Sequence, residues 1–389
     1  MLRERPSSES GGTDQSVTGD VPLLRLEGIV RNFGDECALE DLTLTVHEGE
    51  LLTLLGPSGC GKTTALRCIA GLERVDEGRI ILGGELIADA DRSVPPEQRD
   101  VGLVFQDFAL FPHLSAAENI AFGIEDWPRE HREKRVQELL ELVDLADQAH
   151  SKPGELSGGQ QQRIALARSL APRPSILLLD EPFSNLDEAQ RVRMREEVRR
   201  ILKSTGTTAI SVTHDQEEAL SISDRLAVMT DGTIEQIGHP EAVFQQPRSR
   251  FVADFLGHAG FLPGEVAGEY VETSIGPVPL SQIRGLTEDY QGTAIDVLIR
   301  PDDITALPSP TERADGHVIY RRYLGPSVLY RVDVGDDTTL ETLHNHSDQI
   351  DLDEPVSIHL TAEHELAWFP RESDLAGYAD GVTSGMDDD

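Results

Sequence analysis

The sequence predicts an α/β domain with a mainly parallel sheet, followed by a small all-β, barrel-like domain. Up to about Gly257, strand-like and helix-like segments alternate, and continuous apolar runs at 175–180 and 208–213 are typical of strands buried on both faces. After Gly257, glycine and proline become frequent, helical periodicity disappears and short strands remain. The 389 residues also exceed what one core usually organises, so two domains are expected.

The predicted boundaries follow from these changes in composition. We expect a disordered N-terminal segment at 1–20, the α/β domain at 21–257, the β domain at 258–370 and an acidic disordered tail at 371–389. Within the α/β domain the patterns predict strands at 23–30, 42–46, 50–56, 99–105, 175–180 and 208–213, helices after the loop in 56–70 and at 131–149 and 189–203, and two strands in 226–237. Within the β domain they predict strands at 295–301, 317–323, 327–334 and 356–360.

The charge is strongly acidic, with 70 acidic against 34 basic residues and a formal net charge of −36. One interpretation is a surface for cationic partners. The other, which we favour because the acidic residues are spread along the chain, is adaptation to a salt-rich cytoplasm. No basic stripe is present to neutralise phosphates, so we expect no nucleic-acid partner.

Targeting signals and cysteines point to the cytosol. No run approaches the roughly 18 apolar residues of a membrane helix, and the polar start lacks the apolar centre of a secretory signal. Cys37, Cys60 and Cys68 are few and odd in number, which fits a reducing compartment, and their spacing matches no zinc site. We therefore expect the chain to stay in the cytosol unless a partner holds it at a membrane.

A glycine-rich loop stands between a predicted strand and a predicted helix. Glycines let consecutive backbone N–H groups face phosphate oxygens, and the helix that follows directs its positive end at the same anion. Lys62 supplies the charge that reaches the β- and γ-phosphates, and Thr63 offers a hydroxyl to Mg²⁺. A chance glycine-rich turn is the alternative, but it does not explain the flanking elements. The predicted nucleotide-binding residues are Gly56, Pro57, Ser58, Gly59, Cys60, Gly61, Lys62, Thr63 and Thr64.

Two acidic residues end the buried apolar strand at 175–180. A strand of this kind places them at the carboxyl edge of the sheet, beside the glycine-rich loop. Asp180 is expected to orient Mg²⁺, and Glu181 to polarise the attacking water as a general base. Taken alone, the pair reads as a solvated acidic strand end; together with the loop it predicts ATP hydrolysis.

The segment Leu156-Ser-Gly-Gly-Gln160 resembles the LSGGQ signature of the ABC ATPases, and it precedes Asp180 as that family requires. The resemblance implies a P-loop NTPase fold with a RecA-like core, a helical subdomain and an antiparallel β subdomain. It also implies ATP and Mg²⁺ as cofactors and a homodimer. In such a homodimer, Ser157, Gly158, Gly159 and Gln160 of one chain bind the γ-phosphate held by the other.

Four further positions match landmarks of the family. Phe33 stands where an aromatic residue stacks on adenine, although a hydrophobic packing role is the alternative. Gln106 matches a glutamine that contacts Mg²⁺ and the attacking water, and Asp187 lies in a segment that crosses the dimer interface, with Asn185 a mild departure from the usual sequence. His214 matches a histidine that bonds the γ-phosphate, although a lone histidine at a strand end is usually structural.

The segment 107–123 resembles the region that receives a coupling helix from a membrane subunit, although its aromatic residues are also compatible with a core role.

The second domain resembles the TOBE-like domain of importer ATPases, which implies two permease subunits, an external solute-binding protein and a place on the cytoplasmic face of the membrane. The runs 94–113 and 257–264 are most similar to ferric-iron importers. Molybdate, sulfate, polyamine or sugar import stay open. Repair and translation ATPases are disfavoured, because the chain has one P-loop and no sustained heptads.

Overall fold

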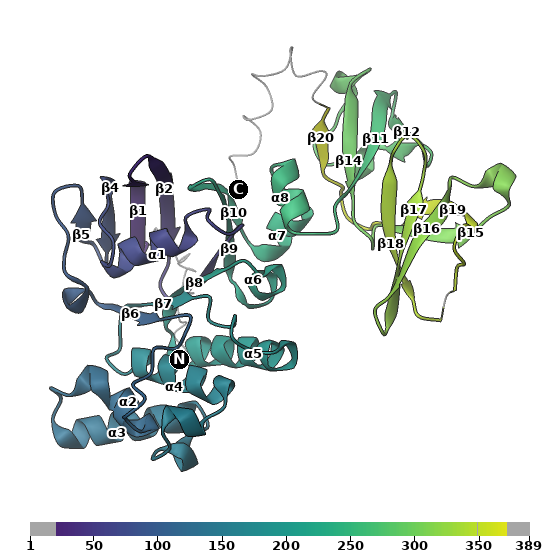
Figure 1. Ribbon diagram of the computed structural model, residues 1–389. Helices are drawn as coiled ribbons and strands as arrows, with labels where there is room; N and C mark the ends of the chain where they lie inside the picture. The colour runs from purple at the N-terminus through teal and green to yellow at the C-terminus, as the bar shows by residue number, and fades with distance from the viewer. Residues whose placement is uncertain (1–20, 348, 372–389) are drawn as a thin grey trace, which may run out of the picture.

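The computed structural model describes residues 21–347 and 349–371 (Figure 1). The predicted segment 1–20 and the tail from 372 onward lie outside the described residues. Arg371, the first residue of the predicted tail, is described; its backbone N–H donates to Ala294 and its side chain pairs with Asp296 at 3.0 Å. No helix in the described ranges is both long and apolar enough to span a membrane.

Within the described residues, the α/β part contains ten strands and eight α-helices. In chain order they are β1 Leu24–Phe33, β2 Glu36–Val46, β3 Leu51–Leu55, α1 Lys62–Ala70, β4 Glu77–Leu82, β5 Glu85–Asp89, β6 Val101–Val104, α2 Ala116–Ala121, α3 Arg129–Leu142, α4 Gly158–Leu170, β7 Ile176–Asp180, α5 Glu188–Thr205, β8 Thr208–Thr213, α6 Gln216–Ile222, β9 Arg225–Thr230, β10 Thr233–Gly238, α7 Pro240–Gln245 and α8 Arg250–Phe255.

The central sheet has the order β10-β9-β3-β8-β7-β6, and all its strands run parallel except β10. Alternate side chains along its strands point to opposite faces of the sheet and pack into two different hydrophobic cores. Ile176 and Leu178 pack with α1 and the antiparallel sheet β2-β1-β4-β5, whereas Leu177 and Leu179 pack with α2 to α5. A strand buried on both faces explains the unbroken apolar run in the sequence. The α/β prediction is confirmed.

The predicted helix at 131–149 is partly wrong, because α3 ends at Leu142. Asp144 takes a left-handed conformation, with φ of 52°. Its N–H donates to the carbonyl of Glu141, and the N–H of Leu145 donates to the carbonyl of Leu140 at 2.8 Å. These two bonds are a Schellman motif, which satisfies the last helical carbonyls and turns the chain. The apolar periodicity continues past the motif and hides it in the sequence.

The C-terminal part holds two five-stranded sheets, of order β13-β12-β11-β14-β20 and β15-β19-β16-β17-β18. Their strands are β11 Gly260–Ala267, β12 Tyr270–Thr273, β13 Val278–Pro279, β14 Ala294–Ile299, β15 Ile304–Pro308, β16 Gly316–Tyr323, β17 Ser327–Asp333, β18 Thr339–Asn345, β19 Pro355–Leu360 and β20 Trp368–Pro370. Both sheets share one core. The Thr342 hydroxyl donates to the carbonyl of Ile304 at 2.8 Å and joins β18 to β15, so the second sheet closes on itself as a barrel does.

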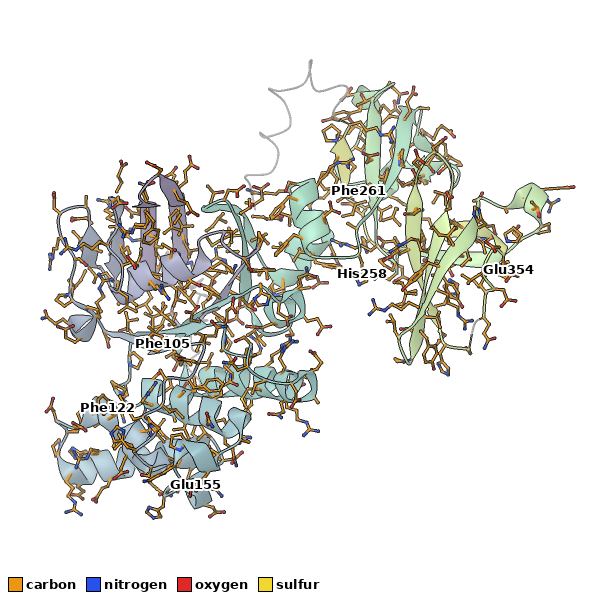
Figure 2. All side chains as sticks on the ribbon, in the orientation of Figure 1. Phe105, Phe122, Glu155, His258, Phe261 and Glu354 are labelled. Carbon is orange, nitrogen blue, oxygen red and sulfur yellow. The ribbon has the colours of Figure 1, made fainter. Side chains whose placement is uncertain are left out.

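Arg300 fastens the two parts together. Its side chain is only 4% exposed, and its guanidinium donates to the carbonyl oxygens of Phe244, Ala253 and Gly257 while lying 4.0 Å above the Phe244 ring. Burial lowers the pKa of Arg300 to about 10. His258 and Phe261 lie at this junction in Figure 2. The C-terminal sheets are therefore tied to α7 and α8 by a charge shared among backbone carbonyls.

Candidate active site

The loop from Gly56 to Gly61 joins β3 to α1 at the carboxyl edge of the central sheet. Gly61 has φ of 101°, and a Cβ there would lie 2.3 Å from the carbonyl oxygen of Ala38. A Cβ on Gly56 would lie 2.4 Å from the carbonyl oxygen of Met229. Only glycine fits these positions, so the loop packs against the start of β2 and the end of β9. The predicted cradle residues Pro57, Ser58, Gly59, Cys60 and Thr64 lie in this loop and at the start of α1.

Lys62 is 5% exposed, and its ammonium donates to the carbonyl oxygens of Gly56 and Pro57 at 2.8 Å each. Within the described residues it forms no ion pair with a carboxylate. Helix α1 begins at Lys62 with no acidic residue in its first turn and no side chain capping its N–H groups. An ammonium with no direct carboxylate partner beside an uncapped helix N-terminus is the electrostatic arrangement that attracts a phosphate.

Thr63 and Asp180 face each other across this edge of the sheet. The Thr63 hydroxyl donates to Asp180 Oδ1 at 3.3 Å. Burial raises the pKa of Asp180 above its usual value, and the hydrogen bond from Thr63 opposes this rise. A hydroxyl and a carboxylate are hard oxygen ligands of the kind that Mg²⁺ binds together with substrate phosphates. The pair therefore fits a magnesium ion.

Glu181 is the point at which three segments meet. One carboxylate oxygen lies 3.1 Å from His214 Nδ1, and the other accepts a long hydrogen bond from Gln106 Nε2 at 3.4 Å. Glu181 has φ of 43°, a left-handed conformation that non-glycine residues adopt rarely and mostly at functional sites. Its N–H donates to the carbonyl of Val212 on β8. The carboxylate is thus held between strand ends, and it lines a cavity of about 100 Å³ together with His214.

The segment after Glu181 supports this arrangement in ways that the sequence analysis missed. The Asn185 side chain donates to the carbonyl of Gln106 at 2.7 Å, and the Ser184 hydroxyl donates to the carbonyl of Glu181. Asp187 caps α5 by accepting from the N–H of Gln190 at 2.9 Å. Asn185, which differs from the residue usual at this position in the family, therefore stabilises the backbone of Gln106 through its side-chain amide.

A second set of hydrogen-bonded residues that the sequence did not predict, Thr213, Asp215 and Glu218, adjoins His214. The Thr213 hydroxyl donates to Glu218 Oε2 at 2.8 Å and accepts from the N–H of Asp215 at 3.0 Å, while Asp215 Oδ1 accepts from the N–H of Glu218. Glu218 is 3% exposed, and burial raises its pKa to about 8. Only the Asp215 cap of α6 is a recognisable sequence signal.

Ser157 lies in the helical layer, apart from the loop at 56–61. It caps α4: its hydroxyl accepts from the N–H of Gln160, whose side chain accepts in return from the N–H of Ser157 at 2.8 Å. Glu155, two residues earlier, marks this end of the helical layer in Figure 2. Ser157 is exposed, whereas Gly158 is half-buried and Gly159 is buried in the first turn of α4. A single chain thus does not bring the Ser157 turn and Lys62 together.

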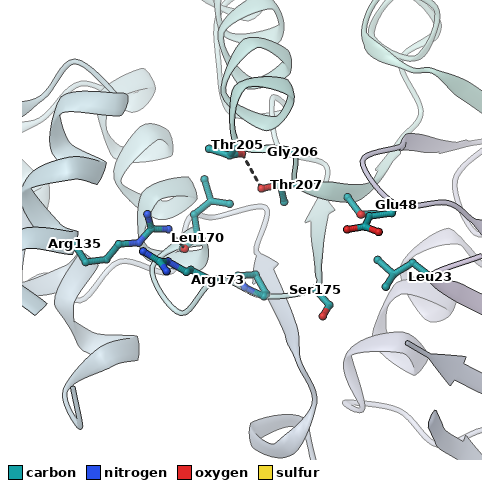
Figure 3. Close-up of a pocket in the computed structure, with 11 residues that line it drawn as sticks. Leu23, Glu48, Arg135, Leu170, Arg173, Ser175, Thr205, Gly206 and Thr207 are labelled. Carbon is teal, nitrogen blue, oxygen red and sulfur yellow. Dashed lines mark hydrogen bonds between the residues drawn. The ribbon is translucent and has the colours of Figure 1, made fainter. Parts of the chain in front are cut away.

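Phe33 ends β1 and is 45% exposed, with the Arg31 guanidinium 4.5 Å from its ring centroid. Such exposure is unlike a ring packed in a core and leaves it accessible for stacking. A separate cavity of about 470 Å³, lined among others by Arg135, Arg173 and Thr207, opens at the other edge of the sheet where β7 and β8 begin (Figure 3). This cavity is not part of the site.

Comparison with known proteins agrees with the fold. The ABC transporter family model matches residues 39–184, and the TOBE domain model matches 297–368. An Fe(3+) ions import ATP-binding protein of Agrobacterium fabrum is 42% identical over 309 residues, covering 79% of this chain and 86% of the relative. A spermidine/putrescine import ATP-binding protein of Pseudomonas fluorescens is 46% identical over 313 residues, covering 78% and 83%.

A solved structure gives the same picture. It is cbiO1 from Clostridium perfringens, part of the ABC transporter complex cbiONQ; it has a TM-score of 0.53 at 29% identity and covers 57% of this chain and 90% of that one. The fold, with its glycine-rich loop between β3 and α1, defines a P-loop ATPase. The chain belongs to the family of ABC transporter ATP-binding proteins, and it is the ATPase of an importer with a C-terminal TOBE domain.

Proposed function

We propose that two copies of this chain bind two ATP molecules between them and hydrolyse them to drive solute uptake. The observation that carries this proposal is the separation within one chain of two anion-binding features. Lys62 and the start of α1 lie at the sheet edge, and α1 packs into one core, whereas exposed Ser157 begins α4, which packs into the other core. A nucleotide held by the first feature reaches the second only if the second comes from another copy.

The residues of the site have different roles in ATP binding and hydrolysis. The loop N–H groups and Lys62 bind the phosphates, and Lys62 exchanges its two carbonyl partners for phosphate oxygens. Glu181 accepts a proton from the attacking water, Gln106 orients that water, and His214 holds the γ-phosphate and Glu181 in register. Phe33 stacks on the base, and Asp187 faces the partner copy.

Mg²⁺ fits beside Thr63, Asp180 and Gln106, and when bound it neutralises charge on the phosphates. Thr63 and Asp180 already share a hydrogen bond at 3.3 Å, so the two ligand atoms are held on the same side of the loop. Ser157, Gly158, Gly159 and Gln160 of the partner complete the phosphate contacts. Closure around ATP and opening after hydrolysis are then a population shift driven by the ligand.

Ferric iron is the proposed cargo, taken up through two permease subunits with an external solute-binding protein, while this chain lies on the cytoplasmic face of the membrane. The similarity to ferric-iron import ATPases supports this choice. A polyamine is the second candidate, since polyamine import ATPases are equally similar. ATP turnover by the assembled transporter decides: iron-loaded binding protein should stimulate it and spermidine-loaded binding protein should not. The reverse result would assign the polyamine.

The hydrolytic assignment is tested by Glu181→Gln. The amide keeps the shape of the side chain but cannot accept the proton, so turnover should fall by about 100-fold or more while ATP still binds. Glu196→Gln, at an exposed position on α5, is the matched control and should keep full turnover. Equal turnover by Glu181→Gln and the parent chain would show that the base is elsewhere.

A further inference from the structure

Arg191 on α5 contacts two segments that are about 30 residues apart in the chain, 184–187 and the loop at His214 and Asp215. Its Nη2 donates to the carbonyl of Leu186 at 3.3 Å, and its Nη1 lies 3.4 Å from Asp215 Oδ2 and 3.0 Å from Glu188 Oε2. Leu186 precedes Asp187, and Asp215 follows His214. The planar guanidinium therefore joins the segment 184–187 to the loop that carries His214.

The loop at His214 is extensively hydrogen-bonded on the side that Arg191 reaches. Asp215 caps α6 through Oδ1 and accepts from Arg195 at 2.8 Å through Oδ2, so a force on its carboxylate moves the backbone on both sides of it. Its N–H is bonded to Thr213, whose hydroxyl is anchored on buried Glu218. His214 projects from the middle of this closed set of bonds.

A cavity of about 100 Å³ lies where these groups meet. It is lined by Arg191 together with Glu181, Ser184 and His214. The Arg191 guanidinium is thus on one wall of the space that borders the catalytic pair, while its other contact is to the segment proposed to face the second copy. A shift of Leu186 or Asp187 changes the position of Arg191 and, through Asp215, the position of His214.

We propose that Arg191 is a positioning residue that transmits contact between two copies, made by segment 184–187, to His214. This inference rests on the proposed function, because it assigns the segment 184–187 to the interface. Arg191 touches neither nucleotide nor water in this scheme. It makes the distance between His214 and Glu181 depend on the presence of the partner, so each copy hydrolyses ATP only when paired.

The test is steady-state ATP hydrolysis by the full chain against ATP concentration, for the parent, Arg191→Gln and Arg193→Gln. Arg193 is exposed on the same helix and is the matched control. Arg191→Gln should lower kcat by about 10-fold, a loss of roughly one charge-assisted contact, and lower the Hill coefficient toward one. Affinity for a fluorescent ATP analogue and the thermal midpoint should stay near those of the control. A purely structural role would lower the midpoint without changing the Hill coefficient.

Two further variants guard against a folding defect. Arg191→Lys keeps the charge but cannot hold Leu186 and Asp215 together, so kcat should stay low. Asp215→Asn keeps the helix cap, and the double variant with Arg191→Gln should be no slower than the slower single variant. If the parent chain does not hydrolyse ATP, the proposed function fails and this inference with it. If the parent is active and cooperative while Arg191→Gln and Arg191→Lys match the control, only this inference is overturned.

Discussion

Replacing Glu218 with glutamine should change the pH dependence of stability in a direction set by burial. The Glu218 carboxyl is almost completely enclosed, and burial raises its pKa from 4.5 to about 8. The folded chain therefore holds a proton that the unfolded chain releases near pH 4.5. The stability that this protonated group provides is complete below pH 4.5 and is lost as the pH rises to about 8.

The size of the effect follows from the two pKa values. As the pH rises from below 4.5 to above 8, the difference between the folded and unfolded pKa values of Glu218 removes about 5 kcal/mol of unfolding free energy. Roughly 1 kcal/mol of this loss falls between pH 7 and pH 9. Glutamine cannot ionise and still offers an oxygen to Thr213. Relative to the parent, Glu218→Gln should therefore gain stability as the pH rises, even if it is less stable at pH 5.

Urea unfolding at pH 5, 7 and 9 and constant salt measures this difference, because the midpoint and slope give the free energy at each pH. Glu241→Gln, at an exposed position on α7, is the control and should run parallel to the parent. A constant difference in unfolding free energy between Glu218→Gln and the parent from pH 5 to pH 9 would show that Glu218 carries no extra proton in the folded chain.

Three further changes have defined outcomes. Lys62→Ala should abolish ATP turnover without unfolding the chain, and retained turnover would reject the phosphate-cradle assignment. Gly61→Ala should lower unfolding free energy by at least about 1–3 kcal/mol, because its Cβ would lie 2.3 Å from the carbonyl oxygen of Ala38 at a left-handed φ; an unchanged urea midpoint would contradict this. The acidic surface predicts loss of structure at low salt, and an unaltered circular dichroism spectrum in dilute buffer would count against that prediction.

The sequence predicts most readily those features that lie together in the chain. The loop at Lys62 and the acidic strand end at Asp180 each sit within a few residues, and a parallel sheet brings such strand ends to one edge. The surroundings of His214 were harder to foresee: Glu181 follows from its place at a buried strand end, but His214 was assigned from the family resemblance, and the bonds of Glu218 to Thr213 and of Arg191 to Asp215 were not predicted. Those bonds depend on where long side chains turn after the helices pack, which local periodicity does not encode.

The ends of helices were also predicted poorly, because backbone hydrogen bonds rather than apolar periodicity decide where a helix stops. The apolar pattern of α3 continues beyond Leu142, but two backbone hydrogen bonds at Asp144 and Leu145 end the helix. Nothing in that stretch is a glycine, so the usual signal of a left-handed cap is missing. The buried strands were placed within about two residues because their apolar runs are continuous and bounded by polar residues.

Pairing of two copies around ATP can be observed directly by sedimentation of Glu181→Gln. This variant should bind ATP without consuming it, so with ATP and Mg²⁺ it should sediment as a dimer and without nucleotide as a monomer. Adding Ser157→Arg, which fills the first turn of α4, should return it to a monomer that still binds ATP. A monomer at saturating ATP, or a dimer indifferent to the change at Ser157, would contradict the account.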